Sequence, residues 1–394
     1  SSINVFSQET SASIDIVYFA NDSTYAPGSG VSVHIDPKGV YELIDINNDG
    51  NITQSDLEDP QNNHFILELS SAGGSFANPT EIGTVYDFYT PLINGVIPLG
   101  TNGGEYKLRI RATKAVTFDA NFNETGTEET AVVTEEFFTI SSSNNFDNQF
   151  YLSSVAPNDE VLFQCVSTNS INPSFGSVTR SSAQTTSVIT TVGNYDQLRI
   201  YLNDTNGDSE YTAVLRGISN DSYIQTLDIV HSTITEDYIQ IPYGNILDAL
   251  QLGTYNLEII EVNDGISNLK SVSFLWHTKT KNIESQVESI CVDEEVNIFF
   301  NNLTLATNYK ASYFKLDYGD NSSPEFYTLP EILINNSSDN NTHELPHTYD
   351  LVSCGSENDS DGNASFEIEL FLFNKFRIGS AGNCDDYIQN GGVV

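Results

Sequence analysis

Short segments in which apolar residues occupy every second position recur along this chain, and they constrain its fold more than any other feature. Residues 13–19 (SIDIVYF) and 31–35 (VSVHI) alternate in this way. Alternation places the apolar side chains on one face of a strand, so each segment predicts a half-buried β-strand. Clusters of Asn, Asp and Gly between the segments supply turns. The pattern predicts an all-β fold made of β-sandwiches.

The 394 residues are too many for one ordinary sandwich and suit several, each large enough to bury its own core. A polar stretch, SSSNNFDNQ, follows the predicted strand 135–140 and is typical of a linker. A second run of predicted strands extends over residues 145–280. We therefore expect three domains, covering residues 1–143, 144–280 and 281–394.

The chain is strongly acidic, with 15 Lys and Arg against 54 Asp and Glu and a net charge of -39. Such a surface excludes nucleic acid as a partner, and divalent cations are its natural counterions. No run of about 18 apolar residues occurs, so we expect no direct membrane insertion. Abundant Asn, Ser, Thr and Ile with few Lys are typical of a secreted β protein.

Residues 45–56 (DINNDGNITQSD) are the one place where side-chain spacing dictates a chemistry. Counted from Asp45, oxygen-bearing side chains fall at positions 1, 3, 5, 9 and 12, and glycine falls at position 6, as in twelve-residue calcium loops. The sequence therefore predicts one structural calcium (Ca2+) site, anchored to a core by Ile52 at position 8. The predicted ligands are Asp45, Asn47, Asp49, the Asn51 carbonyl, Thr53 and Asp56.

Two other loops carry incomplete versions of this spacing. Residues 203–210 (NDTNGDSE) have Ser209 where glycine is needed, and residues 357–365 (ENDSDGNAS) lead to Ile368 at the closing position. Each is either a second calcium site or an exposed acidic loop.

The four cysteines contain no CxxC pair and do not indicate zinc. We expect one disulfide near the C-terminal end, either Cys291 with Cys384 or Cys354 with Cys384, and a buried free thiol at Cys165. The spacing does not choose between the two pairings.

Lys107, Arg109 and Arg111 alternate onto one face of a predicted strand and form the densest positive cluster. They either grip an anionic glycan or form a solvent-facing row balanced by acidic neighbours such as Glu68. We favour the balanced row.

Two stretches of the first domain resemble a known repeat. Residues 64–83 (HFILELSSAGGSFANPTEIG) and 103–113 (GGEYKLRIRAT) are similar to an Ig-like repeat of large Bacteroidota surface proteins. The resemblance covers about 50 residues and implies an Ig-like sandwich. The strand count and spacing of the second domain also fit such a sandwich.

The third domain resembles a PKD domain, an Ig-like module. The matching motifs, in order, are CVDEEVNIFFNN, YFKLDYGDNSSPE, HTYD and FEIELFLFN. Leu316 replaces the usual tryptophan and Asn321 the second glycine, which marks an atypical member. The resemblance implies structural roles for Gly319 and Asp320 in a tight turn and for His347 at a strand corner.

No nucleophile, metalloprotease or phosphate-binding motif occurs, so we expect no enzyme. Together the resemblances imply a stretch of a gliding-motility adhesin of the Bacteroidota, exported by type IX secretion and displayed on the cell surface. Its expected function is that of a calcium-stiffened stalk, with neighbouring repeats of the same chain and a surface polysaccharide as partners. A carbohydrate-binding module region and a surface-layer protein are the alternatives.

Overall fold

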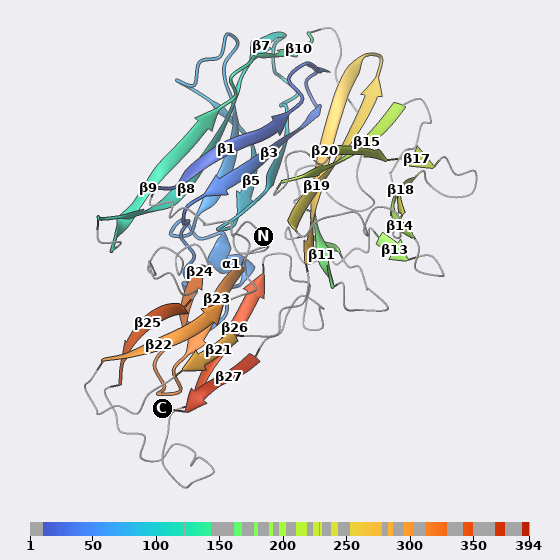
Figure 1. The fold of residues 1–394 in the computed structure, drawn as a ribbon. Helices are drawn as coiled ribbons and strands as arrows, with labels where there is room; N and C mark the ends of the chain where they lie inside the picture. Colours follow the sequence, from blue (N-terminus) through green and yellow to red (C-terminus); the bar gives the residue numbers. More distant parts are fainter. Residues whose placement is uncertain are drawn as a thin grey trace.

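The computed structural model is all-β, as predicted, and its one helix within the described residues is a single turn, α1 (Gln54–Leu57) (Figure 1). Each sheet takes its strands from only one of the three predicted segments. The structure describes residues 11–120, 123–142, 161–167, 177–179, 189–191, 197–201, 210–218, 224–227, 229–230, 238–242, 253–277, 283–286, 295–302, 312–328, 342–349, 367–374 and 388–393.

The first sandwich packs a sheet of order β1-β3-β6 against one of order β5-β4-β8-β9, and a short sheet β2-β10-β7 closes one end. Its strands are β1 (Ser13–Phe19), β2 (Thr24–Tyr25), β3 (Gly30–Lys38), β4 (His64–Leu69), β5 (Thr80–Tyr86), β6 (Leu92–Val96), β7 (Gly104–Tyr106), β8 (Leu108–Phe118), β9 (Glu124–Val133) and β10 (Phe138–Ile140).

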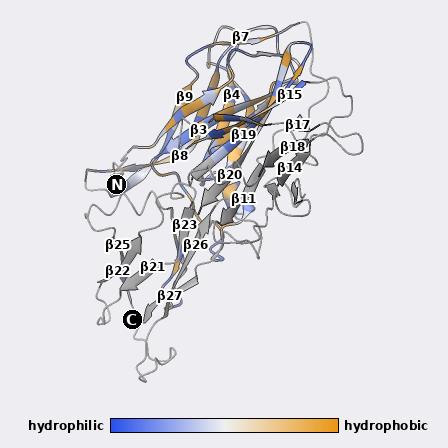
Figure 2. Ribbon diagram, turned by 45° about the vertical axis from the view of Figure 1, so that its right-hand side comes forward, coloured by the Kyte–Doolittle hydropathy of each residue, from blue (hydrophilic) through white to orange (hydrophobic). Residues whose placement is uncertain are grey.

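Alternation within these strands builds the core of the first sandwich. In β8, Leu108 and Ile110 are fully buried, whereas the intervening Arg109 and Arg111 point outward. Figure 2 shows the same alternation of apolar and polar residues along the neighbouring strands. Near the short sheet, Phe138 meets other aromatic rings edge-on, including Tyr25 at a centroid distance of 5.5 Å. Burial of these rings supplies much of the hydrophobic stabilisation of the domain.

The second sandwich has two sheets, of order β13-β14-β18-β17 and β12-β11-β20-β19-β15-β16. With β13 taken as strand A, these are the ABED sheet and the GFC sheet of an immunoglobulin domain. The GFC sheet is extended by β16 on the C side and by β11 and β12 on the G side. The strands are β11 (Val161–Ser167), β12 (Ser177–Thr179), β13 (Ile189–Thr191), β14 (Gln197–Tyr201), β15 (Glu210–Gly217), β16 (Ile224–Leu227), β17 (Ile229–Val230), β18 (Tyr238–Pro242), β19 (Gly253–Asn263) and β20 (Ile266–His277).

The third sandwich pairs β21-β22-β25 with β24-β23-β26-β27, which is the strand order of the first sandwich repeated. The chain is therefore a tandem array of Ig-like domains. The strands are β21 (Ile283–Gln286), β22 (Glu295–Asn302), β23 (Ser312–Asp317), β24 (Glu325–Thr328), β25 (Thr342–Thr348), β26 (Glu367–Asn374) and β27 (Ile388–Val393).

The turn and corner predicted for the third domain have the expected geometry. Gly319 has a φ of 72°, and Asp320 accepts a hydrogen bond from the Ser322 amide at 2.9 Å. The ring of His347 stacks on Tyr318 at 3.6 Å, and its Nε2 lies 2.9 Å from Asp320. These contacts join the turn after β23 to the end of β25, so His347 has the structural role that the resemblance implied.

The three sandwiches do not form a simple end-to-end row, because the first contacts both of the others. Its strand β3 lies against β20 of the second sandwich, and its loop 45–56 lies against β23 of the third (Figure 1). Contact with β20 also corrects one expectation. We predicted β3 to be half-buried, but Ser32 and His34 on its outer face are 0% exposed because the second sandwich covers them.

Candidate metal site

The candidate metal site, the loop 45–56, leaves the first sandwich after β3 and ends in α1. Its first half is a series of tight turns. The Gly50 amide donates to Asp45 Oδ2 at 2.7 Å, the Asp49 amide to Asn47 Oδ1 at 2.9 Å, and the Asn51 amide to Asp49 Oδ1 at 2.9 Å. Gly50 has a φ of 78°, a left-handed conformation that glycine adopts without strain.

The second half of the loop is a helix N-terminus built around Asp56. The Thr53 hydroxyl and amide both donate to Asp56 Oδ2, and the Ile46 amide donates to Oδ1 at 3.2 Å. Burial favours the neutral form of Asp56, but the hydrogen bonds from Thr53 and from the Ile46 and Asn47 amides outweigh it and lower its pKa. Asp56 is thus held as a carboxylate at the closing position of the loop.

Asn62 fixes both ends of this loop, and the sequence analysis did not identify it. Its side-chain amide donates to the carbonyls of Ile44 at 2.8 Å and Asp56 at 2.7 Å, and its Oδ1 accepts from the Ile44 amide. Asn62 is 0% exposed. No spacing rule would find it, because it lies six residues beyond the last position of the calcium pattern.

The donors of the loop fit a hard cation in one respect and depart from the pattern in another. Asp45 is only 8% exposed, and its Oδ1 is buried without a hydrogen-bond donor. Against this, no group of three His, Cys, Asp or Glu within the described part of the chain converges closely enough to hold a metal. Asp56 instead faces the loop backbone, so a bound cation would depend on Asn47, Thr53 and the Asn51 carbonyl beside Asp45 and Asp49.

Ile52 lies where the sequence placed it, against a small apolar cluster that supports the loop. The cluster contains Leu43, Leu57, Phe88 and Tyr89 of the first domain, with Tyr313 of the third domain packed at its edge. A cavity of about 190 Å³ adjoins it. The cavity is lined by Ile52, Thr53, Gln54, Leu57, Asp87, Phe88 and Tyr313.

The row of positive side chains is balanced, as favoured above. Arg109 Nε lies 2.6 Å from the buried carboxylate of Glu68, and Arg111 pairs with Glu68 at 3.4 Å and with Glu129 at 2.9 Å. Lys107 Nζ donates to the Glu135 carbonyl at 2.6 Å. Glu68 and Glu129 thus balance the two arginines, and a backbone carbonyl accepts the hydrogen bond of Lys107.

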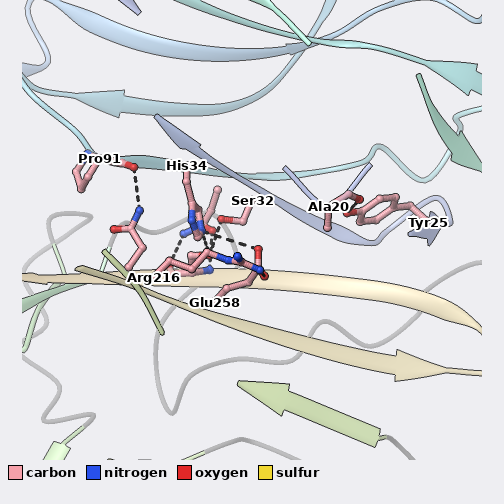
Figure 3. A network of polar contacts seen from close by, with 10 residues as sticks. Ala20, Tyr25, Ser32, His34, Pro91, Arg216 and Glu258 are labelled. Carbon is pink, nitrogen blue, oxygen red and sulfur yellow. Dashed lines mark hydrogen bonds and ion pairs between the residues drawn. The ribbon is translucent and has the colours of Figure 1, made fainter. Parts of the chain in front are cut away.

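A buried polar network between the first and second sandwiches is the other concentration of functional groups (Figure 3). The hydroxyl of Ser271 on β20 lies 2.7 Å from Ser32 Oγ and 2.9 Å from His34 Nε2. Asn94 exchanges two hydrogen bonds with the Ser271 backbone, both at 2.9 Å. The Gly30 amide donates to Asn268 Oδ1 at 2.7 Å, so directional hydrogen bonds join the two domains, beside the apolar contact of Leu269 with the core of the first sandwich.

The pKa values of two side chains in this network, His34 and Glu258, are strongly shifted because water is excluded from them. His34 and Glu258 are both 0% exposed and lie 3.9 Å apart. Burial raises the pKa of Glu258 to about 7, although Arg216, 3.6 Å away, opposes the shift. Burial and the Arg216 charge lower the pKa of His34 to about 3. Arg216 in turn stacks on Tyr18 at 3.6 Å.

The remaining predicted features lie outside what the structure describes. Loop 203–210 is described only at Glu210, and loop 357–365 not at all. Cys291, Cys354 and Cys384 are likewise outside the described residues, as is the side chain of Cys165. The second calcium sites and the disulfide stay predictions. Within the described residues, no helix is long and apolar enough to cross a membrane.

No family model and no curated protein matches this sequence. Among solved structures, the chain is similar to extracellular domains 3-5 of Drosophila OTK, with 8% identity, a TM-score of 0.26, and coverage of 94% of this chain and 95% of that one. A titin fragment gives 10% identity, a TM-score of 0.26, and coverage of 93% and 94%. Dimeric latent PorU from Porphyromonas gingivalis gives 9% identity, a TM-score of 0.19, and coverage of 92% of this chain and 32% of that one. Such low TM-scores carry no argument, so the Ig-like assignment rests on the strand orders above.

Proposed function

We propose that this chain is a non-enzymatic, calcium-stabilised segment of a large extracellular adhesin, with one Ca2+ held by loop 45–56. The observation that carries the calcium proposal is the buried Oδ1 of Asp45, which has no hydrogen-bond donor at the first position of the loop. A buried carboxylate oxygen is costly to leave unpaired, and a cation would complete it. The turns at Asn47, Asp49 and Gly50 already have the order that a calcium loop needs.

The residues of the loop explain how an ion would stabilise the domain. Asp45, Asp49 and Asp56 place three carboxylates within twelve residues, and their mutual repulsion favours opening of the loop. A bound calcium ion would supply two positive charges at this point. Asn62 and Ile52 connect the loop to the sandwich, so a loop held closed would also hold the apolar cluster around Leu57. Extracellular sites of this kind bind calcium at about 10⁻⁴ to 10⁻³ M.

The adhesin assignment draws on composition and on the resemblances of the first and third domains. Strong acidity, tandem Ig-like sandwiches and the PKD-like turn are consistent with a surface protein of the Bacteroidota exported by type IX secretion and used in attachment or gliding. Because the first sandwich contacts both others, this segment would be a cluster of domains within such a protein rather than a length of straight stalk.

A surface polysaccharide is the proposed partner. Arg109 lies over Phe76 at 4.9 Å and Lys107 over Phe137 at 4.7 Å, on the outer face of the first sandwich. Phe137 is 41% exposed. An exposed ring beside charged and hydrogen-bonding groups suits the mixed polar and apolar faces of a sugar.

Removing two loop ligands tests the calcium proposal. In the intact chain, Asp45→Ala with Asp49→Ala should lower the melting temperature in calcium and abolish its response to a chelator. The matched control is Glu128→Ala with Glu136→Ala, which removes the same charge from exposed positions and should leave the chelator response intact. Wild-type melting that is the same with calcium and with chelator would refute the proposal.

A further inference from the structure

We infer that Lys315 of the third domain competes with calcium for loop 45–56, so that ion binding and the contact between the first and third domains oppose each other. This inference rests on the calcium site proposed above. It begins from Gly50, at position 6 of the loop. Gly50 is buried, although Asn47, Asn48, Asp49 and Asn51 around it are exposed.

The third domain is what buries Gly50. A Cβ atom placed on Gly50 would lie 3.2 Å from Lys315 Nζ and 3.6 Å from Pro324 Cγ. Lys315 belongs to β23, and Pro324 belongs to the turn that follows it. The ammonium group of one domain is therefore in contact with the turn of the proposed calcium loop in another.

Charge gives this contact a direction. Three carboxylates in the loop attract an ammonium group, and a divalent cation at the same place repels it. Lys315 is thus expected to lower the affinity for calcium. Coupling between two binding events is reciprocal, so calcium must weaken the docking of Lys315 by the same factor.

The apolar part of the junction can accommodate such a change. Tyr313, two residues before Lys315 on β23, meets Phe88 edge-on at 5.7 Å and packs beside Ile52. The cavity of about 190 Å³ lies among these same side chains. A junction with a cavity has fewer contacts to break than a close-packed core, so the domains can shift there at a smaller cost.

Calcium titration of the intact chain by calorimetry tests the inference. Lys315→Met keeps the length of the side chain and removes its charge, and it should tighten calcium binding about fivefold. Lys107→Met removes the same charge just before β8, where Lys107 bonds to the Glu135 carbonyl and not to the loop. This control should change the calcium affinity less than about twofold. Lys315→Arg keeps the charge and should behave like the wild type.

Small-angle scattering of the same proteins supplies a second readout. Calcium should increase the radius of gyration of the wild-type chain, and it should change that of Lys315→Met much less. Equal calcium affinities for Lys315→Met and Lys107→Met would overturn the inference while leaving the calcium site intact. A wild-type chain that binds no calcium would overturn the site and the inference together.

Discussion

Replacing Glu258 by glutamine should change the pH dependence of stability in a way that identifies the buried network between the first two domains. The folded protein raises the pKa of Glu258 from 4.5 to about 7, so the folded state holds a proton that the unfolded state releases. Unfolding free energy therefore falls as the pH rises from 4.5 to 7. The full difference is about 3 kcal/mol, with a slope of about 1.4 kcal/mol per pH unit.

His34 has the opposite effect on the pH dependence of the unfolding free energy, over nearly the same pH range. Its pKa is lowered from 6.5 to about 3, so the folded state prefers neutral imidazole and stability is lost as the pH falls below 6.5. Between pH 4.5 and 6.5 the two contributions have equal and opposite slopes. Arg216 lies 3.6 Å from Glu258 and lowers its pKa, whereas the more distant Asp22 raises it, and the value of about 7 includes both effects.

The single variants should therefore separate two effects that the wild type conceals. Relative to the wild type, Glu258→Gln should lose stability on acidification from pH 6.5, and His34→Gln should gain stability from pH 7 to 4.5. Chemical denaturation can be followed by the fluorescence of Trp276, the one tryptophan, which belongs to β20 of the interface. Parallel pH profiles for the two variants would refute the reasoning.

Two further substitutions test the loop support and the core. Asn62→Ala leaves the Ile44 amide and the carbonyls of Ile44 and Asp56 without their partner, and it should reduce the unfolding free energy by about 2–4 kcal/mol in urea; a change below about 0.5 kcal/mol would contradict the bridging role. Phe138→Ala empties the centre of the aromatic cluster and should cost about 3–5 kcal/mol. The adjacent Phe137→Ala, at an exposed ring, should cost less than about 1 kcal/mol, and equal losses would refute the assignment of Phe138 to the core.

Features set by neighbours in sequence could be predicted well. Alternation assigned Leu108 to the core and Arg109 to the surface, and the spacing from Asp45 to Gly50 gave the turns of the loop. The resemblance to a PKD domain assigned Asp320 to a tight turn and His347 to a strand corner, and both have these roles in the structure. In each case a local rule, or a motif that encodes one, was sufficient.

Contacts between domains could not be predicted in this way. Ser271 and His34 lie 237 positions apart, and a polar residue on the outer face of a strand has the same pattern whether it meets water or another domain. Lys315 gave no signal because the loop residue that it lies beside, Gly50, is 265 positions earlier in the chain and has no side chain to mark the contact. Asn62 was missed because a side-chain amide that bonds to main-chain groups leaves no spacing to recognise.

The two junctions of the first sandwich differ in chemistry, and this difference predicts what each should respond to. The junction with the second domain buries His34 and Glu258 and is held by hydrogen bonds of strict geometry, so it is sensitive to protonation and resists sliding. The junction with the third domain joins an acidic loop to Lys315 and an incompletely packed apolar cluster. Higher ionic strength should therefore weaken the junction with the third domain more than the junction with the second domain, because salt screens exposed charges more than buried ones.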